Sequence, residues 1–215
     1  MPAAVSTLPR PVLVVVLATG AGILAILLFL RGSSGLYGED GPVEIASVVA
    51  YLGAAVAYAA AAPGLAAGRY WQIPATLLLA AAREMDLDKS LLSGGILKSR
   101  FYTGDFPLWE KLVGLVIVVF ALWAGLRLIR HGAGPVWRAL RSGRGWPWLV
   151  VGALVGVVVA KGFDGIGRKL RPLGIEVSQA LNDQLGDVEE WLELGAAAAI
   201  LLAVALWARS RARPT

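Results

Sequence analysis

Long runs of apolar residues dominate the chain, and most are about as long as a membrane-spanning helix, which needs roughly 20 such residues. Arginines and short polar segments separate these runs. The first run, residues 11–30, is longer than the apolar stretch of about 7–15 residues in a signal peptide, so we interpret it as a span. The pattern predicts six transmembrane helices, over residues 11–30, 42–62, 70–89, 108–129, 147–168 and 188–208.

The third predicted span is interrupted by charge. Only thirteen residues separate Arg69 from Arg83. A helix that rises about 1.5 Å per residue cannot cross a hydrocarbon layer of roughly 30 Å in that length. A single crossing helix must therefore continue to about Lys89, which places Arg83 and Glu84 below the membrane surface.

Two features refine the expected packing. Residues 172–186 place an apolar residue at every fourth position, which predicts a short helix along the membrane interface. Gly152 and Gly156 form a pair of small residues that allows another helix to approach the fifth span closely. The expected fold class is all-α: one integral membrane domain, residues 1–215, with six transmembrane helices and a short interfacial helix.

Composition agrees with a membrane protein. Apolar residues make up 57% of the chain and charged residues 16%, whereas soluble domains contain about 25% charged residues. A net charge of +5 would suggest nucleic acid in a soluble protein, but basic membrane loops account for it here. We therefore expect membrane lipids as partners and no nucleic acid, and the sequence does not identify which proteins, if any, are partners. The absence of cysteine excludes disulfides and thiolate metal sites.

Charge is divided unequally between the two faces that six spans would create. One face receives ten basic residues and no acidic residue. These are Arg10, Arg69, Arg127, Arg130, Arg138, Arg141, Arg144, Arg209, Arg211 and Arg213. The other face also receives ten basic residues but all fifteen carboxylates, so the faces carry charges of +10 and −5. Purely basic loops favour the cytoplasmic side, and we expect a multi-pass protein of the bacterial inner membrane with both termini in the cytoplasm.

Several charges fall inside the predicted helices, near the carboxylate-rich face. Glu84 and Asp88 are four residues apart on the third helix, and Glu189 and Glu193 are four apart on the sixth, so each pair shares a helix face. The fifth helix carries three charges at i, i+3 and i+7. The candidate ligand-binding residues are Glu44, Arg83, Glu84, Asp88, Lys161, Asp164, Arg168, Glu189 and Glu193.

Charges at membrane depth cost several kcal/mol unless they are paired or hydrated, so such residues usually face the interior of a bundle. The expected arrangement pairs basic groups with carboxylates: Arg83, Lys161 and Arg168 with Glu44, Glu84, Asp164 and Glu193. We therefore expect an outward-facing charged pocket, in which surplus carboxylates hold a cation or a proton. The alternative is that the charges only pair with one another and have a structural role.

The residue types limit the chemistry. His131 is the only histidine and is expected on the face opposite the carboxylates. This excludes bis-histidine haem, histidine-rich zinc sites and a Ser-His-Asp triad, and no cofactor is predicted. Oxygen ligation of a divalent cation such as Mg²⁺, Ca²⁺ or Mn²⁺ remains open, with Glu84, Glu189 and Glu193 as the candidate metal ligands.

Three functions remain open at this stage. The pocket could bind a polar, ionic or lipid-headgroup ligand, as in a transporter or binding protein. It could belong to a membrane-embedded enzyme that acts on a lipid-linked substrate through carboxylate acid–base chemistry. The chain could also be a structural or assembly subunit of a membrane complex.

Sequence motifs add a resemblance to this interpretation. The second span opens with an acidic-Gly-x-x-Glu element, "EDGPVE", and the third ends in "REMDLDK", followed by "ILKSRFY". In these motifs residues 39–111 resemble a family of small bacterial polytopic inner-membrane proteins of unassigned function, and the resemblance implies no activity. Membrane hydrolases related to alkaline ceramidases use a histidine-held metal, and this chain lacks those histidines.

Overall fold

Helices account for nearly all of the structure, a computed structural model that describes residues 7–30 and 41–212. No strand occurs among these residues. The helices, in chain order, are α1 (Arg10–Phe29), α2 (Pro42–Ala61), α3 (Pro63–Ala67), α4 (Gln72–Glu84), α5 (Leu87–Leu91), α6 (Ser99–Thr103), α7 (Leu108–Arg141), α8 (Trp146–Phe163), α9 (Ile166–Leu170) and α10 (Gln179–Arg211), with a 3₁₀ turn, η2 (Arg171–Leu173), before α10.

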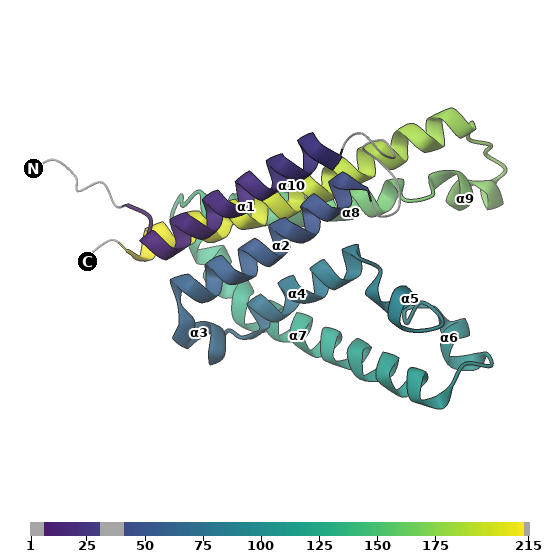
Figure 1. The fold of residues 1–215 in the computed structure, drawn as a ribbon, viewed down its shortest axis with the longest axis horizontal. Coiled ribbons are helices and arrows are strands. Elements are labelled where there is room, and N and C mark those ends of the chain that lie inside the picture. The colour runs from purple at the N-terminus through teal and green to yellow at the C-terminus, as the bar shows by residue number, and fades with distance from the viewer. Residues whose placement is uncertain (1–6, 31–40, 213–215) are drawn as a thin grey trace, which may run out of the picture.

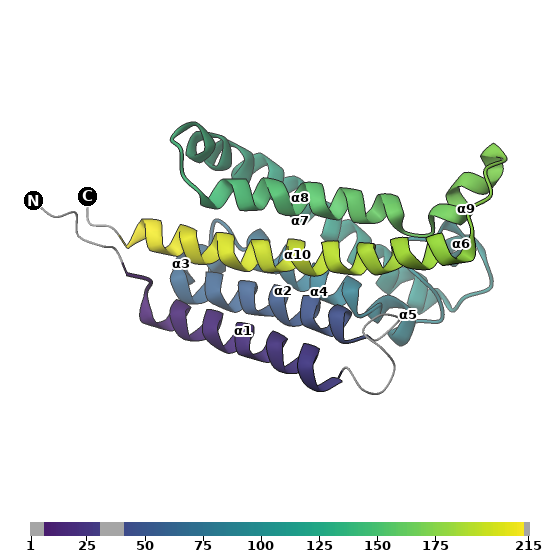
Figure 2. The same cartoon turned by 90° about the horizontal axis from the view of Figure 1, so that it is seen from above.

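The long helices and α4 run up and down the bundle in alternation, so both termini lie at the same end (Figure 1). Turning the molecule by 90° shows α1, α2 and α10 side by side, with α8 next to α10 (Figure 2). We call the end where α1 begins and α10 finishes the arginine end, because the described arginines there are Arg10, Arg69, Arg127, Arg130, Arg138, Arg141, Arg144, Arg209 and Arg211. The opposite end, where α4 and α8 finish and α10 begins, is the carboxylate end.

Five helices of the described chain are long and apolar enough to cross a membrane: α1, α2, α7, α8 and α10. The chain therefore has the features of a multi-pass membrane protein. Only 11% of the apolar window of α1 and of α7 is buried by the rest of the protein, so these helices expose apolar side chains around most of their circumference. Such surfaces are typical of contact with lipid tails.

The prediction of one continuous helix over residues 70–89 is wrong. The helix α4 ends at Glu84, after 13 residues, which corresponds to a rise of about 20 Å. Asp86 then adopts a left-handed conformation with φ 43° and ψ 37°, and a separate short helix, α5, follows. A left-handed residue ends a helix because it turns the backbone away from the axis. For this reason α4 is absent from the helices long enough to span a membrane.

The interfacial helix expected at residues 172–186 is also wrong, since a turn and an extended segment occupy residues 174–178. The last helix begins at Gln179, where the Ser178 hydroxyl caps it by accepting a hydrogen bond from the Leu181 N–H. The span expected at 188–208 is thus the central part of α10. The fifth span, expected at 147–168, ends at Phe163, and Gly165, with φ 55°, separates α8 from α9.

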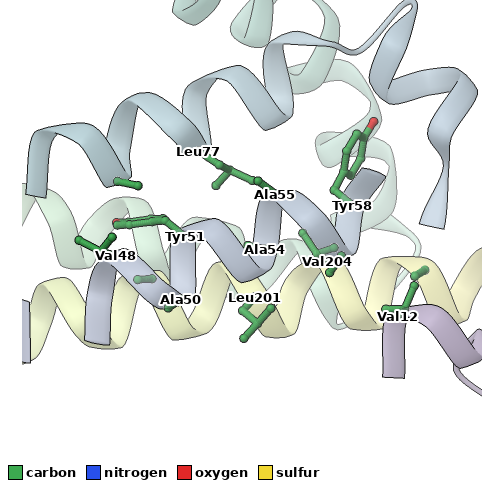
Figure 3. Close-up of a cluster of buried hydrophobic side chains, with 14 residues drawn as sticks. Val12, Val48, Ala50, Tyr51, Ala54, Ala55, Tyr58, Leu77, Leu201 and Val204 are labelled. Atoms are coloured by element: carbon green, nitrogen blue, oxygen red, sulfur yellow. The ribbon is translucent and has the colours of Figure 1, made fainter. Parts of the chain in front are cut away.

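The core lies around α2, which packs against α1, α4 and α10. It is built largely from alanines with a few larger residues, including Tyr51, Leu77 and Leu201 (Figure 3). Small side chains allow close helix contact. A Cβ atom added at Gly53 of α2 would lie 2.6 Å from Thr19 Cγ2 of α1, so this crossing tolerates only glycine.

Only one glycine of the predicted pair on α8 lies at a helix contact. A Cβ atom at Gly156 would lie 3.7 Å from Ala196 Cβ, so this glycine faces α10, whereas one at Gly152 would meet nothing within 4 Å. The α8–α10 packing therefore depends on one small residue, and it brings the ends of these two helices together.

A small separate cluster covers the start of α7. Leu92, Ile96 and Phe101 are buried together, and an added Cβ at Gly114 of α7 would lie 2.8 Å from the Phe101 ring. Glu110, which is only 5% exposed, accepts hydrogen bonds from the backbone N–H and the hydroxyl of Ser93, both 2.9 Å long. The segment between α4 and α7 is thus fixed to α7 by packing and by a buried carboxylate.

Candidate functional site

A charged cavity of about 210 Å³ lies at the carboxylate end. Four parts of the chain build it: the first turns of α2, the end of α4 with the turn that follows, the last turn of α8, and α10. Its lining residues are Glu44, Ser47, Arg83, Glu84, Asp86, Lys161, Gly186, Glu189, Glu190 and Glu193. Six of these are carboxylates and two are basic, so the wall carries an excess of negative charge.

Lys161 is the main cationic group of the cavity. Its Nζ lies 2.6 Å from Glu193 Oε1 and 3.1 Å from Glu189 Oε1. Both carboxylates lie on one face of α10, and their side chains are only 13% and 16% exposed. The lysine side chain is 46% exposed, so the cavity reaches the surface beside it. One ammonium group therefore forms ion pairs with two carboxylates.

The packing of α8 on α10 accounts for this contact. Gly156 approaches α10 at Ala196, and Lys161 follows little more than one turn later on the same helix. The two helices are antiparallel, so Glu193 and Glu189 come successively within reach of the lysine as α10 is followed back from Ala196.

A second ion-pair group forms in the turn after α4. Arg83 Nη1 lies 2.5 Å from Asp86 Oδ1, and Lys89 pairs with the other oxygen of the same carboxylate. The Arg83 and Lys89 side chains are about half exposed, and ion pairs of this kind contribute about 0–1 kcal/mol. Both basic groups of this turn are thus engaged locally by Asp86.

Glu84 differs from the other carboxylates of the cavity. Within the described ranges it forms no ion pair, while the two nearest basic residues, Lys161 and Arg83, are engaged by other carboxylates. It interacts electrostatically with Glu193 and Glu44, which repel it, and with Lys161 and Arg83, which attract it. It is also the last residue of α4, where the negative end of the helix dipole disfavours an anion. An anionic Glu84 is therefore held in place at an energetic cost.

Most of the predicted site residues meet in this cavity, but three do not. The cavity brings together Glu44, Arg83, Glu84, Lys161, Glu189 and Glu193. Because the helix breaks at Asp86, Asp88 does not share a face with Glu84, and its Oδ2 instead accepts a hydrogen bond from the Ile96 N–H, 3.0 Å long. Asp164 and Arg168 lie beyond the end of α8, with side chains 46% and 79% exposed and 4.0 Å between their charged groups.

Sequence reasoning missed four lining residues: Ser47, Asp86, Gly186 and Glu190. Ser47 follows Glu44 by three positions on α2, so helical spacing alone could have found it. Glu190 is next to Glu189 on α10. Asp86 enters the cavity only through its left-handed backbone, which the sequence does not signal. Glu39 and Asp40, from the "EDGPVE" motif, lie outside the described residues.

The candidate metal ligands Glu84, Glu189 and Glu193 all line the cavity. Among the residues that the structure places, no group of three or more His, Asp and Glu side chains is arranged to hold a metal ion. The oxygen atoms of Glu189 and Glu193 that converge do so on the Lys161 ammonium.

Among the described residues, buried side chains lie next to the cavity on the side toward the middle of the bundle. Tyr51, Ala81 and Ala197 are buried immediately behind it, between the carboxylate end and the middle of the core. Comparison with known proteins gives no relative: no protein-family model matches the chain, and no curated protein or solved structure is significantly similar to it.

Proposed function

We propose that the chain is a binding protein of the bacterial inner membrane whose carboxylate-lined cavity holds a cation or the cationic group of a small polar ligand. The observation that carries the proposal is the position of Glu84, a carboxylate without an ion pair among the described residues, at the wall of a cavity with six carboxylates and two basic groups. Negative potential concentrated in a cleft attracts cations and raises their local concentration. The buried residues behind the cavity favour binding at this end over a continuous passage.

The ammonium of Lys161 indicates the kind of ligand group that fits in the cavity. It shows that a primary ammonium group fits between carboxylates of α10 in this cavity. A second ammonium group, or a metal ion that keeps its water, would find Glu84 and Glu44 on the facing helices α4 and α2. The zwitterionic headgroup of an aminophospholipid carries such a group and belongs to the ligand class that the proposal includes.

Replacing Glu84 by glutamine tests this proposal. Wild-type protein in detergent is titrated with Na⁺, Mg²⁺ and ethanolamine hydrochloride at constant ionic strength, and the melting temperature is measured. We expect a saturable rise for at least one of these cations, since a ligand that binds only the folded state stabilises it. Glu84→Gln should weaken that binding roughly 10- to 100-fold, because a charge-assisted contact contributes about 1.5–3 kcal/mol.

The matched control is Glu176→Gln, which removes an exposed carboxylate from the same end but outside the cavity. It should leave the cation response unchanged. The proposal fails if no cation stabilises the wild type in a saturable way, or if Glu84→Gln responds as the wild type does.

The proposed orientation places the termini in the cytoplasm and the charged cavity on the outer side. The chain contains no cysteine, so single cysteines can report topology without background. We expect Glu176→Cys, at the carboxylate end, to react in intact cells with a membrane-impermeant maleimide, and Arg144→Cys, at the arginine end, to react only after the cells are opened. The reverse labelling pattern would place the cavity on the cytoplasmic side.

A further inference from the structure

A second cavity, of about 310 Å³, lies at the arginine end, and the charged site does not use it. Its walls come from α2, α3, α4, α7, α8 and α10 and from the connection between α3 and α4. They are formed mainly by apolar side chains, among them Ile73, Leu77, Val150, Ile200 and Val204. Its volume lies at the lower end of the roughly 300–1,000 Å³ typical of small-molecule sites.

Polar groups occur at a few points of this apolar wall. Tyr58 stacks on Trp207 with ring centroids 5.1 Å apart, and the Arg211 guanidinium lies 5.1 Å from the Trp207 ring on its way to the surface. The indole N–H of Trp146 is buried and has no hydrogen-bond partner among the described residues. A buried donor without a partner is costly, and a ligand oxygen in the cavity would satisfy it.

The basic residues around the cavity favour an anionic occupant. The described residues of the arginine end include nine arginines and no Asp or Glu. Of these, Arg211 lines the cavity itself. An occupant with a long apolar part and an anionic end matches both the apolar walls and the arginines, and near a membrane that description fits an anionic phospholipid.

We propose that this cavity binds one acyl chain of an anionic phospholipid, with the lipid phosphate held by Arg211 at the cavity mouth. The inference is independent of the cation site, which lies at the other end of the bundle. It predicts a lipid that stays bound after purification and that joins α7 to the α2–α8–α10 part of the bundle, since these helices all contribute to the walls.

The experiment uses the full chain, purified and delipidated in detergent, with phosphatidylglycerol and phosphatidylcholine of identical acyl chains as probes. Native mass spectrometry measures the bound fraction as each lipid is titrated. We expect phosphatidylglycerol to form a saturable 1:1 complex at concentrations at least tenfold below those at which phosphatidylcholine binds.

Two glycines of α7 provide a matched pair of variants. Gly132 lines the cavity, and an added Cβ there meets only the end of Leu128, so Gly132→Leu projects into the acyl-chain space. Gly134 is exposed outside the cavity, where an added Cβ meets only the Arg138 guanidinium. Gly132→Leu should reduce phosphatidylglycerol binding more than tenfold, while Gly134→Leu should bind as the wild type does.

A second matched pair tests the charge without altering the core. Arg211 stacks on Trp207 at the cavity, and Arg141 stacks on Trp137 outside it, at 5.8 Å. Arg211→Gln should weaken phosphatidylglycerol binding about fivefold, the equivalent of roughly 1 kcal/mol. Arg141→Gln should not change it.

Three results would overturn the proposal: equal binding of the two lipids, full binding by Gly132→Leu, or equal loss in Arg211→Gln and Arg141→Gln. Size-exclusion profiles and helical circular dichroism establish that each variant is folded. If Gly132→Leu does not fold, the arginine pair alone decides the outcome. A protein dimer formed in place of the lipid complex would identify a second copy of the chain as the occupant, and this fourth result would also reject the lipid.

Discussion

Replacing Lys161 by methionine is expected to destabilise the folded bundle by about 2–3 kcal/mol, the range for lost hydrogen bonds to charged groups. The substitution leaves Glu189 and Glu193, with side chains only 16% and 13% exposed, without the ammonium that pairs with both. A fully buried pair would cost more. The 46% exposure of the lysine side chain lets water offset part of the loss. The melting temperature in detergent and unfolding by a denaturing detergent both measure the change.

Arg168→Met is the control for this prediction. Arg168 also belongs to an ion pair at the carboxylate end, but its charge lies 4.0 Å from Asp164 and its side chain is 79% exposed. Its removal should cost less than about 1 kcal/mol, as for other surface pairs. Glu189→Gln and Glu193→Gln, combined with Lys161→Met, should restore part of the stability. If the triple variant is no more stable than Lys161→Met alone, charge does not explain the loss.

Gly53→Val is expected to disrupt the crossing of α1 and α2. Even the first atom of a side chain at this position would lie 2.6 Å from Thr19 Cγ2 and 2.9 Å from Thr19 Cβ, so the helices must separate. Overpacking of this kind costs about 1–3 kcal/mol. Separation also exposes α2, the most deeply buried of the candidate spans. We expect a lower melting temperature and a reduced yield of monodisperse protein.

The control for this substitution is Gly20→Val, one residue from Thr19, where an added Cβ meets nothing within 4 Å. It should leave the melting temperature close to that of the wild type. A Thr19→Gly change in the Gly53→Val background removes the three clashing atoms and should recover stability. Equal effects of the two valine substitutions would show that α1 and α2 do not meet closely at Gly53.

Hydrophobic length predicted the all-helical membrane architecture, because α1 and α2 follow runs whose ends proline or arginine marks. The span predicted at 108–129 is too short, since α7 continues through the basic segment to Arg141. Hydrophobic length also failed at α4, where the helix ends although the apolar and charged spacing allows it to continue. Asp86 adopts a left-handed backbone there, and its carboxylate pairs with Arg83 and Lys89. A four-residue repeat was also mistaken for a separate helix at 172–186, although Ser178 is a favourable N-cap residue and indicates the true start of α10.

The candidate site was predictable where it depends on helix periodicity. Glu189 and Glu193 share a face of α10, and the expected pairing of basic groups with carboxylates includes Lys161 and Glu193, whose charged atoms are 2.6 Å apart. Glu84 was also expected to pair, but it forms no ion pair among the described residues. Residues beyond a helix end were not predictable in this way. Asp88 was assigned to the face of Glu84 by spacing, but spacing has this meaning only within one continuous helix. The same reasoning fails for Asp164 and Arg168, which follow the end of α8 at Phe163.

The shortness of α4 has a consequence for how this side of the protein meets the bilayer. Its 13 residues leave about a third of a hydrocarbon layer of roughly 30 Å unfilled along its axis. The irregular chain after α5 packs beside the start of α7, and its Ser93 and Ile96 N–H groups donate hydrogen bonds to Glu110 of α7 and Asp88 of α5. Irregular backbone is tolerated at such depth only where protein shields it and satisfies its polar groups. The protein thus covers this irregular segment with its own side chains, and the Phe101 ring, only 1% exposed, is buried between the segment and α7.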